Sequence, residues 1–217
     1  MPEAEDQTAT LRLIHGTINH GTQLMDPARR RTPTAYYGPK SGMGRAIRYF
    51  QQKGPVRVGV IGLGAGVTAS YCREGDYFRF YDINPLDYAI AITRFSFLRD
   101  CPADKEVLLG DARLTMENQP SQQFDVLAVD AFSSDAIPVH LLTREAVALY
   151  FRHLQPNGIL AVHVSNRYLD LVPVVSRHAR DFAKSAIDVD DDGTDADYLS
   201  SSDWVLVTAD RLTPCAT

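Results

Sequence analysis

The chain has 217 residues, of which 45% are hydrophobic and 23% are charged, and its formal net charge at pH 7 is -5. This length provides for one sizeable hydrophobic core and is too short for two full domains. The negative charge argues against a nucleic-acid-binding surface, which needs clustered Lys and Arg. A small neutral or cationic molecule is therefore the expected substrate.

The first residues, MPEAEDQTAT, are polar and acidic and lack the features of a signal peptide. No segment approaches the roughly 20 apolar residues of a membrane span. Cys72, Cys101 and Cys215 are odd in number and lack CxxC or metal-ligand spacing, so we expect three unpaired thiols in a reducing compartment. The expectation is a cytoplasmic protein with no metal and no membrane contact by this chain; a homodimer is left open.

The segment LRLIHGTINHGTQL, residues 11–24, is broken by glycines and predicts a small β-hairpin ahead of the main domain. RRRTPTAYYGPKSGMG, residues 29–44, is rich in Pro, Gly and charge and predicts a loop. We therefore divide the chain into a polar leader with a small hairpin and loop, residues 1–44, and a Rossmann-like catalytic domain that binds a cofactor, residues 45–217.

From residue 45 onward, strand and helix patterns alternate, which is typical of βαβ units and a mostly parallel sheet. Helices are predicted at residues 45–52, 65–72, 85–98, 144–154 and 168–185, the last with a bend at Pro173. The acidic stretch DVDDDGTDAD, residues 188–197, is predicted to be a solvated loop. Strands are predicted at residues 56–62, 77–82, 106–109, 124–129, 158–164 and 204–208.

Gly62, Gly64 and Gly66 follow the first of these strands directly, in VGVIGLGAG. Glycines in this position let the backbone approach a ligand and open a helix amino terminus, which indicates a nucleotide-type cofactor. The spacing is GxGxG rather than GxGxxG. It therefore disfavours a dinucleotide pyrophosphate.

Two acidic residues end the next two strands. Asp82, in FRFYDINP, stands where a carboxylate accepts hydrogen bonds from ribose hydroxyls, and its alternative role is to cap a helix before Pro85. Asp111, in LLGDARL, stands where a carboxylate could accept from an adenine amino group. With the glycines, these residues predict a site for the adenosine part of a cofactor.

Asp130 and Asp135 lie where the buried strand FDVLAVD continues into the loop AFSSDAIPVHLLT. In open α/β sheets ligands bind at the carboxyl ends of the strands, so both carboxylates are candidate catalytic groups. The alternative for Asp135 is a helix cap, although Thr143 in TREA is the better candidate for that cap.

The chain resembles the spermidine synthase (polyamine aminopropyltransferase) family in a series of motifs: HGTINHGTQ, TAYYG, GLGAG, DINP, GDARL, DAFSSDAIPVHLLT and SNRYLDL. The resemblance runs from about Leu11 to Thr208. It implies a Rossmann-like sheet of the methyltransferase type, mostly parallel and with about seven strands, preceded by a small β-hairpin. Some similar segments are fused to transporter-like membrane regions, so the chain could be free or the soluble domain of a longer protein.

The resemblance implies aminopropyl transfer from decarboxylated S-adenosylmethionine to a polyamine, with release of methylthioadenosine. The attacking amine must be neutral although its pKa is about 10.4, so a carboxylate that accepts its proton assists the reaction. Asp130 matches the family's catalytic aspartate, and Asp135 corresponds to its second acidic residue, with DxxxxD here in place of DxxD. Tyr37 as a catalytic residue, and Tyr36 and Tyr198 as substrate-binding residues, match tyrosines of the family, with packing roles as the alternative.

Ala65 stands where the family carries an aspartate that binds the aminopropyl amine and repels the carboxylate of S-adenosylmethionine. S-adenosylmethionine itself is therefore a second candidate cofactor, and a small-molecule methyltransferase is the alternative function. A catalytically silent nucleoside-binding domain is the third. The six histidines have no convincing metal-ligand spacing and are expected in core, surface or turn positions.

Overall fold

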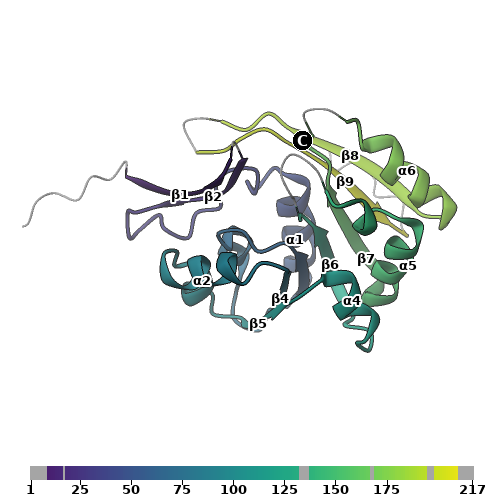
Figure 1. Cartoon of the computed structure of the whole chain (residues 1–217), viewed down its shortest axis with the longest axis horizontal. Helices are drawn as coiled ribbons and strands as arrows, with labels where there is room; N and C mark the ends of the chain where they lie inside the picture. Colours follow the sequence, from purple (N-terminus) through teal and green to yellow (C-terminus); the bar gives the residue numbers. More distant parts are fainter. Residues whose placement is uncertain (1–8, 17, 132–136, 167–168, 195–197, 210–217) are drawn as a thin grey trace, which may run out of the picture.

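The structure is a computed structural model, and it describes residues 9–16, 18–131, 137–166, 169–194 and 198–209. It contains a two-stranded hairpin and a seven-stranded sheet of order β5-β4-β3-β6-β7-β9-β8 (Figure 1). The predicted α/β fold with its amino-terminal hairpin is confirmed. The strands are β1 (Thr10–His15), β2 (Ile18–Leu24), β3 (Arg57–Ile61), β4 (Tyr77–Asp82), β5 (Asp104–Leu109), β6 (Phe124–Val129), β7 (Leu154–His163), β8 (Ser185–Asp191) and β9 (Ser202–Thr208).

The sheet is parallel from β5 to β7, and β9 pairs antiparallel with both β7 and β8. The chain runs outward from β3 through β4 to β5 and then returns to place β6 on the other side of β3. The order of the strands therefore reverses between β3 and β6. In open α/β sheets such a reversal is where ligands bind, at the carboxyl ends of the strands.

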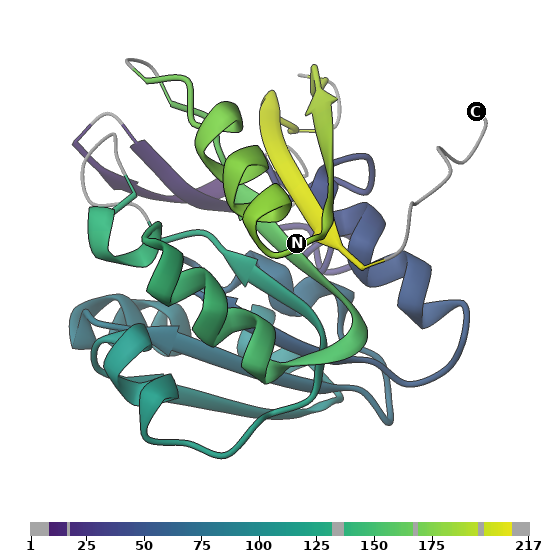
Figure 2. The same ribbon diagram turned by 90° about the vertical axis from the view of Figure 1, so that its right-hand side faces the viewer.

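Helices cover both faces of the sheet (Figure 2). One core cluster packs α1, η1, α2 and α3 on one face, and a second packs α4, η2, α5 and α6 on the other. No helix within the described residues is long and apolar enough to cross a membrane. The helices are α1 (Gly42–Gln51), the 3-10 helix η1 (Val67–Tyr71), α2 (Pro85–Thr93), α3 (Phe97–Asp100), α4 (Ala112–Glu117), the 3-10 helix η2 (Val139–Leu141), α5 (Arg144–His153) and α6 (Val172–Asp181).

Strand β6 shows why its sequence is apolar at almost every position. Val126 and Ala128 belong to the cluster on one face, whereas Leu127 and Val129 belong to the cluster on the other. All four side chains are fully buried. A central strand covered on both sides cannot alternate apolar and polar residues, because either face would then bury a polar group.

Side-chain caps define where several helices begin. Thr143 caps α5 by accepting from the amide of Ala146, which confirms the predicted cap. Asn84 caps α2, so the alternative in which Asp82 caps that helix is wrong. Asp111 caps α4 by accepting from the amide of Leu114.

Four predicted elements differ from the structure. The helix at 85–98 is two helices, α2 and α3, and the helix at 65–72 is only the short 3-10 helix η1. Pro173 does not bend a helix, because it lies in the first turn of α6, where its missing amide hydrogen costs nothing. The acidic loop is wrong for residues 188–191, which belong to strand β8.

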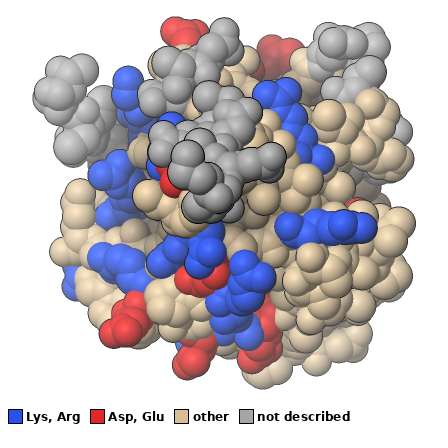
Figure 3. All heavy atoms as spheres, turned by 90° about the vertical axis from the view of Figure 1, so that its left-hand side faces the viewer, with Lys and Arg blue, Asp and Glu red and all other residues tan. Residues whose placement is uncertain are grey.

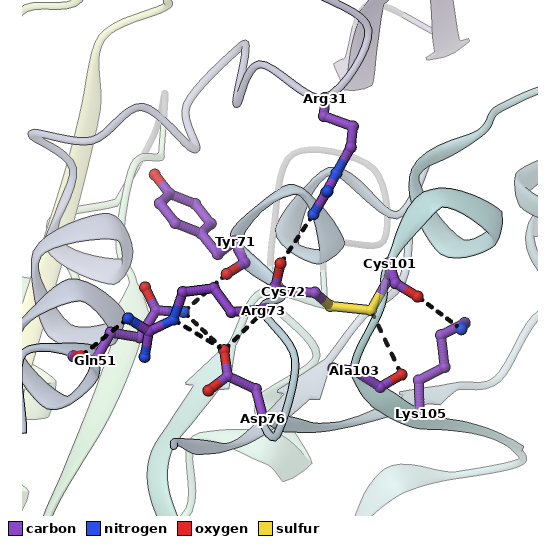
Figure 4. Close-up of a disulfide and its surroundings, with 9 residues drawn as sticks. All are labelled: Arg31, Gln51, Tyr71, Cys72, Arg73, Asp76, Cys101, Ala103 and Lys105. Atoms are coloured by element: carbon purple, nitrogen blue, oxygen red, sulfur yellow. Dashed lines mark hydrogen bonds and ion pairs between the residues drawn. A yellow bond between two sulfur atoms is a disulfide. The ribbon is translucent and has the colours of Figure 1, made fainter. Parts of the chain in front are cut away.

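The expectation of three unpaired thiols is also wrong, because Cys72 and Cys101 form a disulfide with their Cα atoms 5.3 Å apart (Figure 4). Cys72 follows η1 and Cys101 follows α3, and both are buried. Basic side chains donate to the two cysteine carbonyls, with Arg31 at 2.8 Å from that of Cys72 and Lys105 at 3.0 Å from that of Cys101. The bond joins the segment after the glycine loop to the segment before β5.

Polar contacts connect the hairpin and the loop after it to the α3 region of the main domain. The side chain of Gln23 donates to the hydroxyl of Ser96 at 2.8 Å and accepts from the Ser96 amide at 3.0 Å. In the following loop, Arg30 pairs with Asp100 at 2.9 Å. Lys and Arg side chains are spread over the surface on the hairpin side with Asp and Glu among them, so the charge there is mixed in sign (Figure 3).

Candidate functional site

The glycine loop and Asp130 meet at the reversal of strand order. Gly62 follows β3 with φ at 102°, and a Cβ built on it would lie 2.5 Å from the carbonyl oxygen of Asp130. Gly64 has φ at 51°, and a Cβ there would lie 2.5 Å from the carbonyl oxygen of His20. Glycine is therefore required here by the close approach of β6 and of the hairpin. Gly66 has a left-handed conformation and precedes η1.

Asp82 lies at the end of β4, beside the glycine loop. One carboxylate oxygen accepts from the amide of Leu63 at 2.7 Å and the other from the amide of Asn84 at 2.8 Å. Burial raises the pKa of Asp82, while these two backbone hydrogen bonds oppose the rise. Each carboxylate oxygen has a second acceptor position, so the group can still accept hydrogen bonds from ligand hydroxyls.

Asp111 lies at the end of β5 and is more exposed. One of its oxygens caps α4, and the other lies 3.0 Å from Nε2 of His140. The predicted role at an adenine amino group stays a prediction, because both oxygens already have protein partners. His140, expected at a core or surface position, is exposed and lies beside this carboxylate.

Exposed apolar side chains lie next to these two carboxylates. Ile83 follows Asp82 and is 70% exposed, and Leu109, which is paired with Asp82 across β4 and β5, is 49% exposed. Leu114 on α4 is 60% exposed. Large apolar side chains beside carboxylates suit a flat heterocyclic base that carries polar groups on its edges. The sequence analysis missed this feature.

Asp130 is the most enclosed group of the site, with 1% of its side chain exposed. Oδ2 accepts from the hydroxyl of Tyr37 at 2.6 Å, and Oδ1 lies 2.7 Å from Nδ1 of His163. These partners come from the loop before α1 and from β7, so three distant segments converge on one carboxylate. The structure thus brings together two of the predicted catalytic residues, Asp130 and Tyr37.

Aromatic rings surround this carboxylate. The hydroxyls of Tyr36 and Tyr37 lie 3.2 Å apart. The ring of His163 is stacked between those of Tyr36 and Trp204, with centroids 4.6 Å away on each side. Burial, and after it the charge of Asp130, raises the pKa of both tyrosines well above the usual value of 10.0. Both phenols therefore remain protonated donors at neutral pH.

The sequence analysis missed His163, which it treated as one of several isolated histidines. The available signal was its position at the end of a predicted strand, next along the chain after the strand that carries Asp130. Adjacent parallel strands place their carboxyl ends together, and Val129 is indeed paired with Val162. Asp130 and His163 are consequently neighbours across the sheet.

Two predicted site residues remain, Asp135 and Tyr198. Asp135 lies outside the described residues. Tyr198 accepts from the amide of Ala35 through its carbonyl, and its ring lies against the guanidinium of Arg29. Its backbone is thus close to the tyrosine pair, while its predicted contact with substrate stays a prediction.

Ala65 is buried against the hairpin. Its amide donates to the carbonyl of His20 at 3.0 Å, and a Cβ built on Gly21 would lie 2.5 Å from the Ala65 methyl group. The hairpin therefore occupies the space beyond this methyl group. A carboxylate at residue 65 could not be added without moving β2.

The comparisons with known proteins agree with this architecture. No family model matches the chain. The chain is 30% identical to the polyamine aminopropyltransferase of Vibrio vulnificus over 146 residues, which are 65% of this chain and 46% of that protein. It thus spans slightly less than half the length of this curated relative.

Among solved structures, a probable spermidine synthase from Corynebacterium glutamicum is similar with a TM-score of 0.75 at 15% identity, over 99% of this chain and 78% of that one. The chain has a methyltransferase-type fold. Human methyltransferase-like protein 13, solved in complex with SAH, is similar with a TM-score of 0.60 at 15% identity, over 80% of this chain and 82% of that one. A spermidine synthase in complex with the transition-state analogue AdoDATO has a TM-score of 0.52 at 16% identity, over 72% and 55%. These four proteins carry the names of aminopropyl- or methyltransferases.

Proposed function

We propose that the chain is an aminopropyltransferase that moves the aminopropyl group of decarboxylated S-adenosylmethionine to an amine nitrogen of a polyamine and releases methylthioadenosine. The observation that carries the proposal is the enclosed carboxylate of Asp130 at the reversal of strand order, held by Tyr37 and His163. The similarity to a polyamine aminopropyltransferase supports it.

The proposed chemistry follows from the needs of the reaction. An amine nitrogen attacks the carbon beside the sulfonium, a new C–N bond forms as the C–S bond breaks, and the nitrogen then loses a proton. Asp130 would accept that proton, which contributes on the order of 10² to 10⁴ in rate. The ring of Tyr36 is partly buried beside this carboxylate, stacked on His163, and stays a candidate for binding the amine.

The adenosine part of the donor is assigned to the adjacent strand ends. Asp82 would accept from the ribose hydroxyls, and the exposed side chains of Ile83 and Leu109 would cover the base. The backbone of the Gly62–Gly66 loop would border the sulfonium side. Asp111 stays the candidate partner of the base amino group, and Asp135 and Tyr198 stay candidates for the amine.

A small-molecule methyltransferase is the second candidate, and Ala65 favours it. The glycine loop carries no acidic residue, and the hairpin packs on the Ala65 methyl group. The site thus lacks the charge that would repel the carboxylate of intact S-adenosylmethionine. Either cofactor is compatible with the described side chains.

The decisive experiment measures the products. Wild type and the Asp130→Asn variant are incubated with putrescine or spermidine and with either cofactor, and methylthioadenosine and S-adenosylhomocysteine are quantified. We expect methylthioadenosine that depends on the amine and falls by roughly 10² to 10⁴ in the variant. An asparagine can still meet both neighbours, because the Tyr37 hydroxyl can reverse and accept from the new amide.

Asp181→Asn is the matched control, since Asp181 is paired with Arg177 on the far helix α6. S-adenosylhomocysteine as the only product would replace the proposal by the methyltransferase. If neither product forms and the protein still binds methylthioadenosine in a calorimetric titration, the chain is a catalytically silent nucleoside-binding domain.

A further inference from the structure

The histidine at the end of β7 has its ring fixed on every side. Nδ1 lies 2.7 Å from Asp130 Oδ1, and Nε2 lies 2.9 Å from the hydroxyl oxygen of Ser165. That hydroxyl in turn accepts from the amide of Asp203 at 2.8 Å. Tyr36 and Trp204 cover the two faces of the ring. Only 5% of the His163 side chain is exposed.

These contacts favour one arrangement of the ring protons. An ionised carboxylate can only accept, so Nδ1 must donate to Asp130. The Ser165 hydroxyl accepts from a backbone amide and keeps its own hydrogen to donate to Nε2. Every polar atom in this chain of contacts is satisfied when His163 is neutral and protonated at Nδ1.

We propose that His163 is a positioning residue for the proposed reaction and acts through Asp130: its Nδ1–H group fixes one carboxylate oxygen while Tyr37 fixes the other. Two donors on two oxygens restrict the carboxylate to a single orientation, so the acceptor positions that remain are fixed in space. The donors also stabilise the ionised form of the carboxylate, which is the form that can accept a proton.

The inference rests on the proposed function, and it adds a residue at the end of strand β7 to the site. Among the described residues, the titratable groups beside the pair include Tyr36 and Tyr37 from the loop before α1 and Asp203 from β9. Both tyrosines are protonated at neutral pH and cannot cause a change in the acid limb of a rate profile. The His163→Asn variant controls for Asp203, because it removes the imidazole just as His163→Phe does.

Two substitutions separate the two roles of the ring. His163→Phe keeps a ring between Tyr36 and Trp204 and removes the donor to Asp130. His163→Asn removes the ring and retains an amide N–H at about the position of Nδ1. If the hydrogen-bond donor matters, His163→Phe lowers kcat at least tenfold and leaves KM for the cofactor within twofold. The same variant moves the acid limb of the rate profile to higher pH. The His163→Asn variant recovers most of kcat and the acid limb of the wild type.

The rates are measured on whichever product the wild type releases. If that product is S-adenosylhomocysteine, the proposed aminopropyl transfer is refuted, but the role of His163 is still tested by the same variants. Wild-type kcat and an unmoved acid limb in a folded His163→Phe variant would overturn the inference. So would a His163→Asn variant as impaired as His163→Phe, because packing alone would then explain both.

A spectroscopic test needs no turnover. In ¹⁵N-labelled protein, the ring signals of His163 should show a protonated Nδ1 and an unprotonated Nε2 at neutral pH. Asp130→Asn should change this pattern, and the control Asp181→Asn should not. A protonated Nε2 in neutral His163 of the wild type would contradict the assignment even in a protein without activity.

Discussion

Asp82 accepts backbone hydrogen bonds through both carboxylate oxygens, so its replacement affects folding and binding together. Asp82→Ala leaves the amides of Leu63 and Asn84 without this partner, and we expect a loss of about 1–3 kcal/mol in the free energy of unfolding. Loss of the proposed ribose contacts should weaken methylthioadenosine binding by a further 1–3 kcal/mol, on the order of the cost of unpaired polar groups.

Denaturant unfolding and calorimetric titration measure the two effects separately. Asp87→Ala, in the first turn of α2, is the matched control because it removes a nearby acidic side chain to which neither the Leu63 nor the Asn84 amide donates. Unchanged affinity in a folded Asp82→Ala variant would refute the ribose assignment while leaving the structural role intact.

The second donor to Asp130 gives a prediction of its own. Tyr37→Phe removes only the hydroxyl that lies 2.6 Å from the carboxylate, and we expect turnover to fall about tenfold or more, since hydrogen bonds to charged groups are among the stronger ones. Tyr36→Phe should lower turnover less, because its hydroxyl contacts Tyr37 and not the carboxylate. Equal rates for wild type and Tyr37→Phe would contradict this assignment of the donors.

At the scale of elements, the Cys72–Cys101 disulfide connects two segments that are 29 residues apart in sequence. Closing a loop of this length stabilises a chain by about 3.5 kcal/mol in the chain-entropy model. We therefore expect the Cys72→Ser, Cys101→Ser double variant to unfold at lower denaturant concentration than wild type. Cys215→Ser should unfold like wild type.

Thiol counting tests the same bond directly. Denatured protein that has never met a reductant should react at one cysteine, and the reduced protein at all three. Three reactive thiols before reduction would show that the bond is absent in the purified chain, and the expected stability difference would then disappear as well.

At the scale of the whole molecule, the buried His153 links stability to pH. Burial lowers the pKa of His153 below its usual 6.5, the neighbouring charges of Arg152 and Arg79 act in the same direction, and a hydrogen bond to the Met116 carbonyl opposes them. The unfolded chain therefore binds this proton at a higher pH than the folded chain. The contribution of His153 to stability is complete above about pH 6.5 and is lost as the pH falls below it.

We expect the free energy of unfolding to decrease as the pH is lowered through this window, and less so in His153→Gln, whose amide can still donate to Met116. Three carboxyls act in the opposite sense at lower pH. Full burial of Asp82 and partial burial of Asp125 and Asp203 raise their pKa above 3.8, so the folded protein takes up these protons at a higher pH than the unfolded chain. Equal pH dependence in wild type and His153→Gln, measured by denaturant unfolding, would assign the effect to other groups.

Local sequence patterns were sufficient to predict the parts of the site that follow directly from a strand. The apolar runs before Gly62, Asp82 and Asp130 end where the parallel strands end, and parallel strands place those ends at one edge. The pairing of Asp130 with His163 could not be derived in the same way. It depends on which strand lies beside β6 and in which register, and no local pattern determines either.

The other misses also have physical reasons. Strand β8 is an edge strand that directs Ile187 and Val189 inward and exposes Asp188 and Asp190, so its acidic residues concealed an alternating pattern. The disulfide depends on the packing of α3 beneath the glycine loop, where the side chain of Leu98 lies near Gly66. The disulfide contact is not local in sequence, because the two cysteines are 29 residues apart.

The disulfide also makes a covalent ring of residues 72–101, and this ring contains the whole of β4 and α2, including Asp82. Arg94 lies within the ring, exposed at the end of α2. A single tryptic cut after Arg94 therefore does not divide the molecule: the two polypeptides migrate together in a non-reducing gel and separate only after reduction. Strand β4, which carries Asp82, is thus connected to the rest of the chain both through the backbone and through the Cys72–Cys101 disulfide.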